Sequence, residues 1–208
     1  KGEKIMNKAL KPVFLMLVFL FMFLTDCFLL PASAAEPELS TVYLSDAGND
    51  ANTGESETQA FLTMAKAMES LGDAGGTVWV SGQSTFVGAE YTEAPHSGKV
   101  TVTGGTLVFP DKYRYQLGGS TLFEEVTVRH NGEMTFAAAF HPIEFGEKVE
   151  TVNMGSADTG IYVAGGFYEP EKISVTDLDS HITIRSGSYY AVCGFSRKMK
   201  SGTATQTY

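Results

Sequence analysis

The apolar and polar positions along the chain follow a short unit that recurs. Each unit is a triplet of an apolar, a variable and a second apolar residue, followed within a few residues by glycine. The triplets begin at Val78, Val100, Val126, Val152 and Ile182, at intervals of 22, 26, 26 and 30 residues. Repeats of about this length are typical of solenoid proteins, in which each coil buries its apolar face against its neighbours.

The units also resemble one another outside the triplet. Ile182–Arg185 aligns with Val126–Arg129, and the glycine and the phenylalanine that follow align as well. The alignment predicts that these two segments hold equivalent positions in their coils. A second strand-like segment follows the glycine in three units, at Thr106–Phe109, Glu133–Phe136 and Ser188–Val192.

The alternation of apolar and polar residues has the period of a β-strand, and no helical period lies between the units. The sequence therefore predicts an all-β fold, a parallel β-helix solenoid wound from short strands. Alternate side chains of a strand point to opposite faces, so the apolar positions of the triplets should share one interior. The expected interior residues are Val78, Val80, Val100, Val102, Val126, Val128, Ile182 and Ile184.

A helical pattern precedes the first coil. Between residues 58 and 71, apolar side chains recur at the spacing of one helix face. This face consists of Phe61, Met64, Ala65, Met68 and Leu71. Ser56 or Thr58 is expected to cap the start of the helix, and Gly72 its end. The helix should cover the apolar end of the solenoid, after a strand at Thr41–Leu44 and a loop at Ser45–Ser56.

The first residues predict secretion. Lys8 and Lys11 precede the apolar run Val13–Leu24, and Ala32-Ser33-Ala34 has the small-residue pattern of a signal-peptidase site. The run is short for a membrane span, which needs about 20 residues. We interpret residues 1–35 as a leader followed by a signal peptide. The alternatives are an uncleaved membrane anchor and, less favoured, a lipoprotein.

The expected organisation then has three parts. After residues 1–35, residues 36–76 form the strand, loop and capping helix, and residues 77–208 form the coils. The segment after Ser196 has no amphipathic pattern with which to cover the last coil. We therefore expect the sequence to be the N-terminal part of a longer, secreted or surface-attached protein.

The opening of the predicted domain resembles a known group of proteins. The matching residues are Val42, Tyr43, Leu44, Ser45, Gly48, Asn49, Asp50, Asn52, Gly54, Phe61, Thr63 and Ala67. Their pattern is similar to the start of secreted bacterial right-handed parallel β-helix proteins of the pectate-lyase-like superfamily, although Ala60 stands where that group usually has proline. The resemblance covers residues 41 to about 82 and implies a right-handed β-helix. The fold hosts lyases, hydrolases, epimerases and adhesins, so it does not determine an activity.

The net charge of the chain disfavours some classes of binding partner. The first 35 residues hold four of the 15 basic and two of the 24 acidic residues, so residues 36–208 carry 11 basic and 22 acidic side chains and a net charge of −11. An acidic surface disfavours nucleic acids and anionic membranes as partners. Beyond the predicted cleavage site, Cys193 is the only cysteine, so no internal disulfide forms there.

Two groups of polar residues are candidates for chemistry. Asp46, Asp50 and Asn52 lie in one loop and could bind Ca²⁺, although such residues are also what tight turns require. The resemblance implies a lyase role for Asp177, Asp179 and Arg185, since lyases of this fold use Ca²⁺-binding acids and a basic residue that removes a proton. No acidic cluster on a neighbouring unit aligns with these two aspartates. We therefore favour structural turns in both places.

Aromatic residues give a third candidate. Tyrosines expected to point outward could stack on sugar rings, although aromatic ladders are also ordinary packing in such folds. They are Tyr113, Tyr115, Tyr162, Tyr168 and Tyr189, and Trp79 is a further candidate of the same kind. The favoured prediction is a secreted or cell-surface module for adhesion or glycan contact, without catalysis. The alternative is the N-terminal portion of a polysaccharide lyase or glycoside hydrolase.

Overall fold

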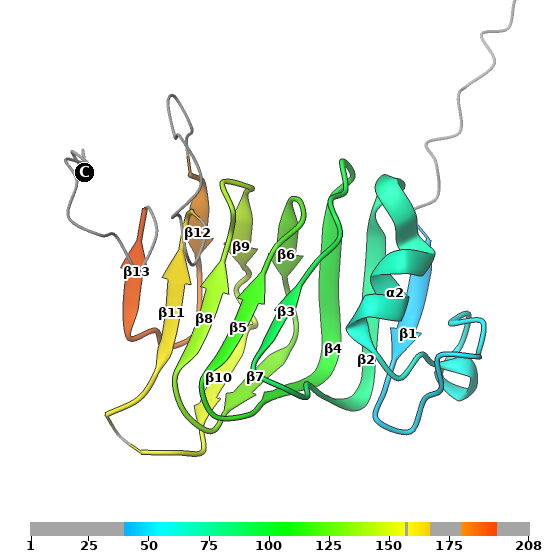
Figure 1. Cartoon of the computed structure of the whole chain (residues 1–208), viewed down its shortest axis with the longest axis horizontal. Coiled ribbons are helices and arrows are strands. Elements are labelled where there is room, and N and C mark those ends of the chain that lie inside the picture. Colours follow the sequence, from blue (N-terminus) through cyan, green and yellow to red (C-terminus); the bar gives the residue numbers. More distant parts are fainter. Residues whose placement is uncertain (1–39, 157, 167–179, 195–208) are drawn as a thin grey trace, which may run out of the picture. The chain divides into compact units, whose positions relative to one another are not determined.

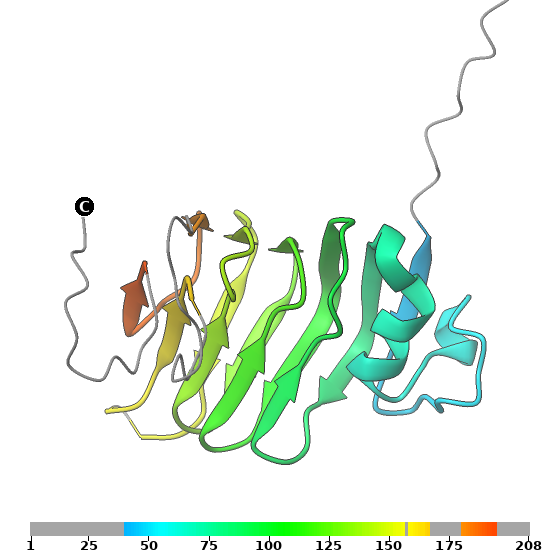
Figure 2. The same ribbon diagram turned by 45° about the horizontal axis from the view of Figure 1, so that its top comes forward.

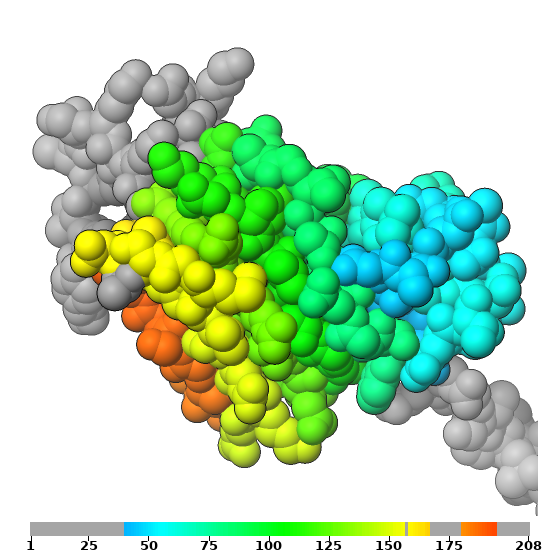
Figure 3. All heavy atoms as spheres, turned by 90° about the horizontal axis from the view of Figure 1, so that it is seen from below, coloured from blue at the N-terminus to red at the C-terminus, as the bar shows by residue number. Residues whose placement is uncertain are grey.

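The computed structural model describes residues 40–156, 158–166 and 180–194 (Figure 1). These residues form a parallel β-solenoid of about four turns, with one short α-helix at its N-terminal end. Figure 2 shows the strands of successive coils side by side, and Figure 3 shows the coils in contact from the N-terminal loop to the last described strand. The predicted signal peptide lies outside the described residues.

Two parallel sheets form the walls of the solenoid among the described residues. The larger sheet has eight strands: β1 (Thr41–Leu44), β2 (Gly76–Thr85), β4 (Val100–Phe109), β6 (Thr121–Phe123), β7 (Thr127–His130), β9 (Ile143–Phe145), β10 (Glu150–Asn153) and β12 (Ile182–Ile184). The smaller sheet has five strands: β3 (Glu90–Thr92), β5 (Tyr113–Gln116), β8 (Met134–Ala137), β11 (Ile161–Ala164) and β13 (Ala191–Cys193). Each pairing is parallel, as the repeat predicted.

From β2 to β10, each coil contributes two strand segments to the larger sheet, whereas β1 and β12 are single segments. Strand β4 pairs with β6 through its first half and with β7 through its second half. In the next coils the two segments are separate strands, since β6 pairs with β9 and β7 with β10. The expected second strand at Thr106–Phe109 is therefore the second half of β4.

This arrangement corrects the expected alignment of the repeats. Ile182 pairs with Ile143, which pairs with Thr121 and hence with Val100. Thr127 instead pairs with Thr106 and Glu150. The Val126 and Ile182 segments therefore hold different positions in the coil, one in each half of the larger sheet. The sequence could not separate them because both halves bury alternate apolar side chains against the same interior.

The interior is apolar and rich in aromatic rings. The valines predicted to face inward in β2, β4 and β7 are buried, as is Val126 before β7, whereas Ile182 and Ile184 are only partly buried. The rings of Phe123 and Phe145 are register partners in β6 and β9 and stack with centroids 5.2 Å apart. Phe136 of the smaller sheet packs edge-on against Phe145 at 5.3 Å, which joins the two walls.

The helix α2 (Met64–Leu71) covers the N-terminal end, beside β1 and β2 (Figure 2). It begins six residues later than expected, because Phe61 pairs with Leu44 in an extended bridge. Thr63 caps α2 by accepting a hydrogen bond from the Lys66 amide at 3.2 Å. The buried face contains Ala67 rather than the expected Ala65, and Gly72 ends the helix as predicted.

Two short 3-10 helices flank α2, η1 (Glu57–Gln59) and η2 (Gly72–Ala74). Within the described ranges, none of these helices has the length and hydrophobicity that crossing a bilayer requires.

Candidate functional site

An exposed tryptophan lies on the outer surface of the larger sheet. Val78 and Val80 point inward, so Trp79 between them points to solvent, where its side chain is 41% exposed. Its indole lies against Gly104 of the neighbouring strand β4. A Cβ atom on Gly104 would approach the indole Cε2 to 3.2 Å, and Gly104 has a φ of +82°. Glycine at this position thus satisfies the backbone and leaves room for the ring.

The residues around Trp79 form a polar, uncharged surface. Tyr43 of β1 and Thr103 of β4 are its register partners on the two sides. The outward positions two residues earlier on the same three strands are all threonine. We call this surface the tryptophan face, and it consists of Thr41, Tyr43, Thr77, Trp79, Thr101 and Thr103. It offers the indole of Trp79 and the phenol ring of Tyr43 among threonine hydroxyl groups.

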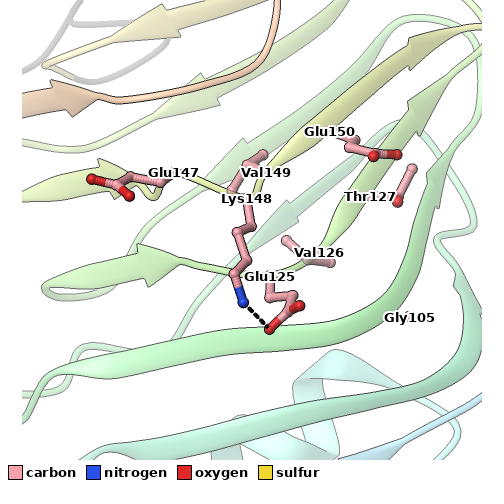
Figure 4. Close-up of a pocket in the computed structure, with 8 residues that line it drawn as sticks. All are labelled: Gly105, Glu125, Val126, Thr127, Glu147, Lys148, Val149 and Glu150. Atoms are coloured by element: carbon pink, nitrogen blue, oxygen red, sulfur yellow. Dashed lines mark hydrogen bonds and ion pairs between the residues drawn. The ribbon is translucent and has the colours of Figure 1, made fainter.

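A hollow of about 460 Å³ adjoins the tryptophan face (Figure 4). Its lining consists of Gly105, Glu125, Val126, Thr127, Glu147, Lys148, Val149 and Glu150. The link to Trp79 is short, because Gly105 follows Gly104, whose amide donates to the Glu125 carbonyl at 2.7 Å. We call this feature the acidic hollow.

The acidic hollow carries an excess of negative charge. The Lys148 ammonium lies 3.2 Å from the Glu125 carboxylate, and Figure 4 shows Glu147 on the opposite side of Lys148 from Glu150. Glu150 is the register partner of Thr127, so a carboxylate and a hydroxyl lie side by side there. Three carboxylates against one ammonium favour neutral or cationic groups and repel anionic ones.

The loop that was a candidate for Ca²⁺ binding is held by hydrogen bonds of its own. The Asp50 carboxylate accepts bonds of 2.9 Å from the Leu62 amide, the Thr63 amide and the Thr63 hydroxyl. The Asn52 amide donates to the Ala60 carbonyl at 2.9 Å. Both residues therefore fasten the loop to the segment before α2. In the part of the chain that the structure describes, no three His, Cys, Asp or Glu side chains gather as metal ligands would.

Asp46 fastens the other end of this loop to β2. Its carboxylate accepts from the Thr85 amide at 2.6 Å, the Thr85 hydroxyl at 2.7 Å and the Gln83 side chain at 3.0 Å. Partial burial by itself raises the pKa of Asp46. The three hydrogen bonds outweigh that effect and hold the pKa below its ordinary value.

Of the three residues suggested by the lyase resemblance, the structure describes Arg185 alone. Asp177, Asp179 and also Tyr168 lie outside the described residues. Arg185 follows β12 on the exposed surface, and its Nε donates to the Glu144 carboxylate at 2.9 Å. Lys99 lies 4.0 Å from the same carboxylate, so Arg185 belongs to a surface ion-pair cluster.

The outward orientation expected for Tyr113 and Tyr115 is wrong. Their exposed fractions are 2% and 0%, and both rings lie in the core. Burial raises the pKa of Tyr113 to about 12, with a smaller contribution from Glu90. The outward residues of β5 are Arg114 and Gln116, so the charge between the two tyrosines was the signal of their orientation.

The remaining tyrosines are half-buried near the last described coil. The Tyr162 ring lies 5.0 Å from that of Tyr190, and the Tyr189 ring lies 5.0 Å from that of Phe145.

The sequence did not single out the acidic hollow. A repeated pattern could have found it, because Glu125 and Lys148 each precede a valine that lies just before the second strand segment of a coil, Val126 before β7 and Val149 before β10.

Comparison with known proteins adds no relative. No family model matches the chain, and neither a curated protein nor a solved structure matches it.

Proposed function

We propose that this protein is a secreted or cell-surface β-helix module that contacts glycans and does not transform them. The observation that carries the proposal is the tryptophan face. An exposed indole beside a glycine offers apolar surface that suits the apolar face of a pyranose ring. Trp is also a residue on which binding energy is often concentrated, because its large rigid surface is buried with little loss of conformational entropy.

The surroundings of Trp79 favour a neutral glycan. The hydroxyls of Tyr43 and the four threonines both donate and accept hydrogen bonds, as sugar hydroxyls do. None of these groups is charged at neutral pH. The acidic hollow next to them repels uronate groups, as does the net charge of −11 on residues 36–208.

The sequence features are consistent with this role. We infer from the predicted signal peptide that the module acts outside the cell. The resemblance of residues 41–82 to pectate-lyase-like proteins supports a right-handed coil, and that fold includes adhesins as well as enzymes. No cofactor is needed for stacking on a sugar.

The second candidate is that the chain is the N-terminal portion of a polysaccharide lyase or glycoside hydrolase. The acidic hollow favours it, because glycoside hydrolases use pairs of carboxylates beside the sugar. Glu125 forms an ion pair with Lys148. The candidate pair of carboxylates in the hollow is therefore Glu147 and Glu150. Lyase chemistry would instead depend on Asp177, Asp179 and Arg185.

Tryptophan fluorescence tests the first proposal directly, since Trp79 is the only tryptophan in the chain. Titration with neutral oligosaccharides should shift the emission of Trp79 and saturate, whereas oligogalacturonate should bind more weakly. Trp79→Ala should abolish retention on an immobilised neutral glycan. Tyr190→Ala is the matched control, because Tyr190 is an exposed aromatic residue on the last described coil.

Retention of Trp79→Ala equal to that of the wild type would contradict the proposal, as would the lack of any response to a broad glycan panel. An activity assay separates the two candidates. Steady release of reducing ends that is lost in Glu150→Gln would support hydrolysis. Unsaturated products that form with Ca²⁺ and are lost in Arg185→Ala would support a lyase.

A further inference from the structure

A buried polar cluster lies on the turn that connects β3 with β4. Glu93 and His96 both belong to this turn, and their side chains are 0% and 3% exposed. The Glu93 carboxylate accepts a 2.6 Å hydrogen bond from the Tyr115 hydroxyl and a 2.9 Å bond from the Gly118 amide, both in the next coil. A carboxylate taken out of water needs such donors, since an unpaired buried charge is strongly unfavourable.

The imidazole of His96 lies between two acceptors. Its Nδ1 is 2.8 Å from the Gly98 carbonyl oxygen, and its Nε2 is 3.4 Å from the Glu93 carboxylate. A carbonyl oxygen only accepts hydrogen bonds, so Nδ1 carries a proton. An ionised Glu93 carboxylate is also only an acceptor, so a hydrogen bond to it requires a proton on Nε2 as well. Only the imidazolium form of histidine donates from both nitrogens.

The other charged groups near His96 come from the neighbouring turns. Asp73 of η2 accepts a 2.8 Å bond from the Ser97 amide, and its negative charge favours the imidazolium. His141, on the equivalent turn two coils further on, opposes it when protonated. However, burial lowers the pKa of His141, with a further contribution from His96, so between the two pKa values His141 is neutral while His96 is charged.

We propose that His96 and Glu93 form a buried imidazolium–carboxylate pair that acts as a pH-sensitive clamp between the first two coils and the turn that follows the capping helix. The pair is closed while His96 is protonated. Loss of the His96 proton leaves the Nε2 lone pair facing the Glu93 carboxylate and opens the clamp.

Because the turn is closely packed, loss of the His96 charge affects the segments on both sides of it. The His96 ring lies on Gly119, and Gly98 lies on the Ala74 carbonyl, with no room for a methyl group at either glycine. The Gly98 amide donates to the Asp73 carbonyl at 2.8 Å. The turn is therefore closely packed on both sides, and a repulsive contact inside it affects both the cap and the second coil.

The direction of the pH effect follows from linkage. The hydrogen bond that His96 donates to Glu93 raises the pKa of His96 above 6.5, against the opposing effect of burial. The hydrogen bond to Gly98 and the negative charges of Glu93 and Asp73 raise it further. A group whose pKa is higher in the folded state contributes its full stabilisation below the unfolded pKa. That contribution is lost as the pH rises through the folded pKa. Stability should therefore fall on the alkaline side of 6.5.

The first experiment is an NMR titration of the histidine side chains in the purified protein. The chain has four histidines, and the spectra of His130→Gln, His141→Gln and His181→Gln assign the His96 signal by exclusion. We expect the midpoint of His96 to lie above 6.5, with both nitrogens protonated on its acidic side. A midpoint at or below 6.5 would overturn the clamp, as would a His96 that keeps a single protonated nitrogen throughout the titration.

The second experiment measures the melting temperature between pH 5.5 and 9. The wild type should lose on the order of a few degrees across the midpoint of His96. Glu93→Gln should flatten this dependence and lower the His96 midpoint, whereas His181→Gln, which removes an exposed histidine, should leave both unchanged. A wild-type melting temperature independent of pH in this range would also refute the proposal. If Glu93→Gln does not fold, the wild-type titration and melting curves still decide.

Discussion

The two ends of the described solenoid differ in how completely their strands are covered. At the N-terminal end, the edge of β1 is covered, since the Tyr43 amide donates to Gly54 and the Phe61 amide donates to Tyr43, both at 2.8 Å. At the other end, apolar side chains of the last described coil are exposed, namely Tyr190 and Val192. The difference shows that burial in this fold comes from the neighbouring coil, not from the strand itself.

One pair of identical residues shows the effect of the neighbouring coil. Val163 and Val192 are register partners in β11 and β13, and both continue the inward row of Tyr115 and Phe136. Val163 has coils on both sides and is 0% exposed, whereas Val192 is 50% exposed. The same valine thus contributes full or partial hydrophobic stabilisation according to its place in the stack.

The largest expected effect contrasts the interior with the exposed end. Val128→Asp places an unpaired charge in an interior where Val128 is fully buried, and we expect a loss of more than about 4 kcal/mol, enough to unfold the domain. Val192→Asp should cost about 1 kcal/mol or less, because its side chain reaches water. Thermal unfolding followed by circular dichroism measures both variants. Equal losses would show that the last coil is as closed as the interior.

A smaller effect is expected at the covered end. Phe61 is buried against Gly54 and the edge of β1, so Phe61→Ala should cost about 3–5 kcal/mol. Tyr190→Ala removes an exposed ring whose neighbour is Tyr162 and should cost about 1 kcal/mol or less. Urea unfolding at equilibrium gives both free energies. A larger loss for Tyr190→Ala than for Phe61→Ala would reverse the comparison.

The smallest effect concerns the loop that covers β1. Asp50→Ala leaves the Leu62 and Thr63 amides without their acceptor and should cost about 1–2 kcal/mol. Asp158→Ala, at an exposed aspartate near the other end, should change little. Because Asp50 is engaged with the protein, Ca²⁺ or EDTA should leave the melting temperature of the wild type unchanged. A rise with Ca²⁺ that is absent in Asp50→Ala would reveal a metal site instead.

The local parts of the fold were predictable where one residue pattern has one structural meaning. The alternation around Val78 and Val100 indicated which side chains face inward, and Gly72 indicated the end of the helix. The alternation in Tyr113–Gln116 carried the same information, but the tyrosines were interpreted as surface residues because the charge of Arg114 was not used. The start of α2 was placed too early because the bridge between Phe61 and Leu44 is a contact distant in sequence.

The sequence by itself determined that the chain winds into parallel coils. A strand that buries alternate side chains and ends in a glycine turn pairs with the equivalent strands of other repeats. Only the tertiary structure decided which copies are neighbours. Val126 and Ile182 satisfy the same local pattern, and the choice between the two halves of the larger sheet depends on how many residues each turn takes up. The tertiary structure likewise placed Trp79 beside Gly104, gathered the acidic hollow, and brought His96 to Glu93 within one buried turn. Those contacts depend on the register between coils, which alternation along a single strand does not encode.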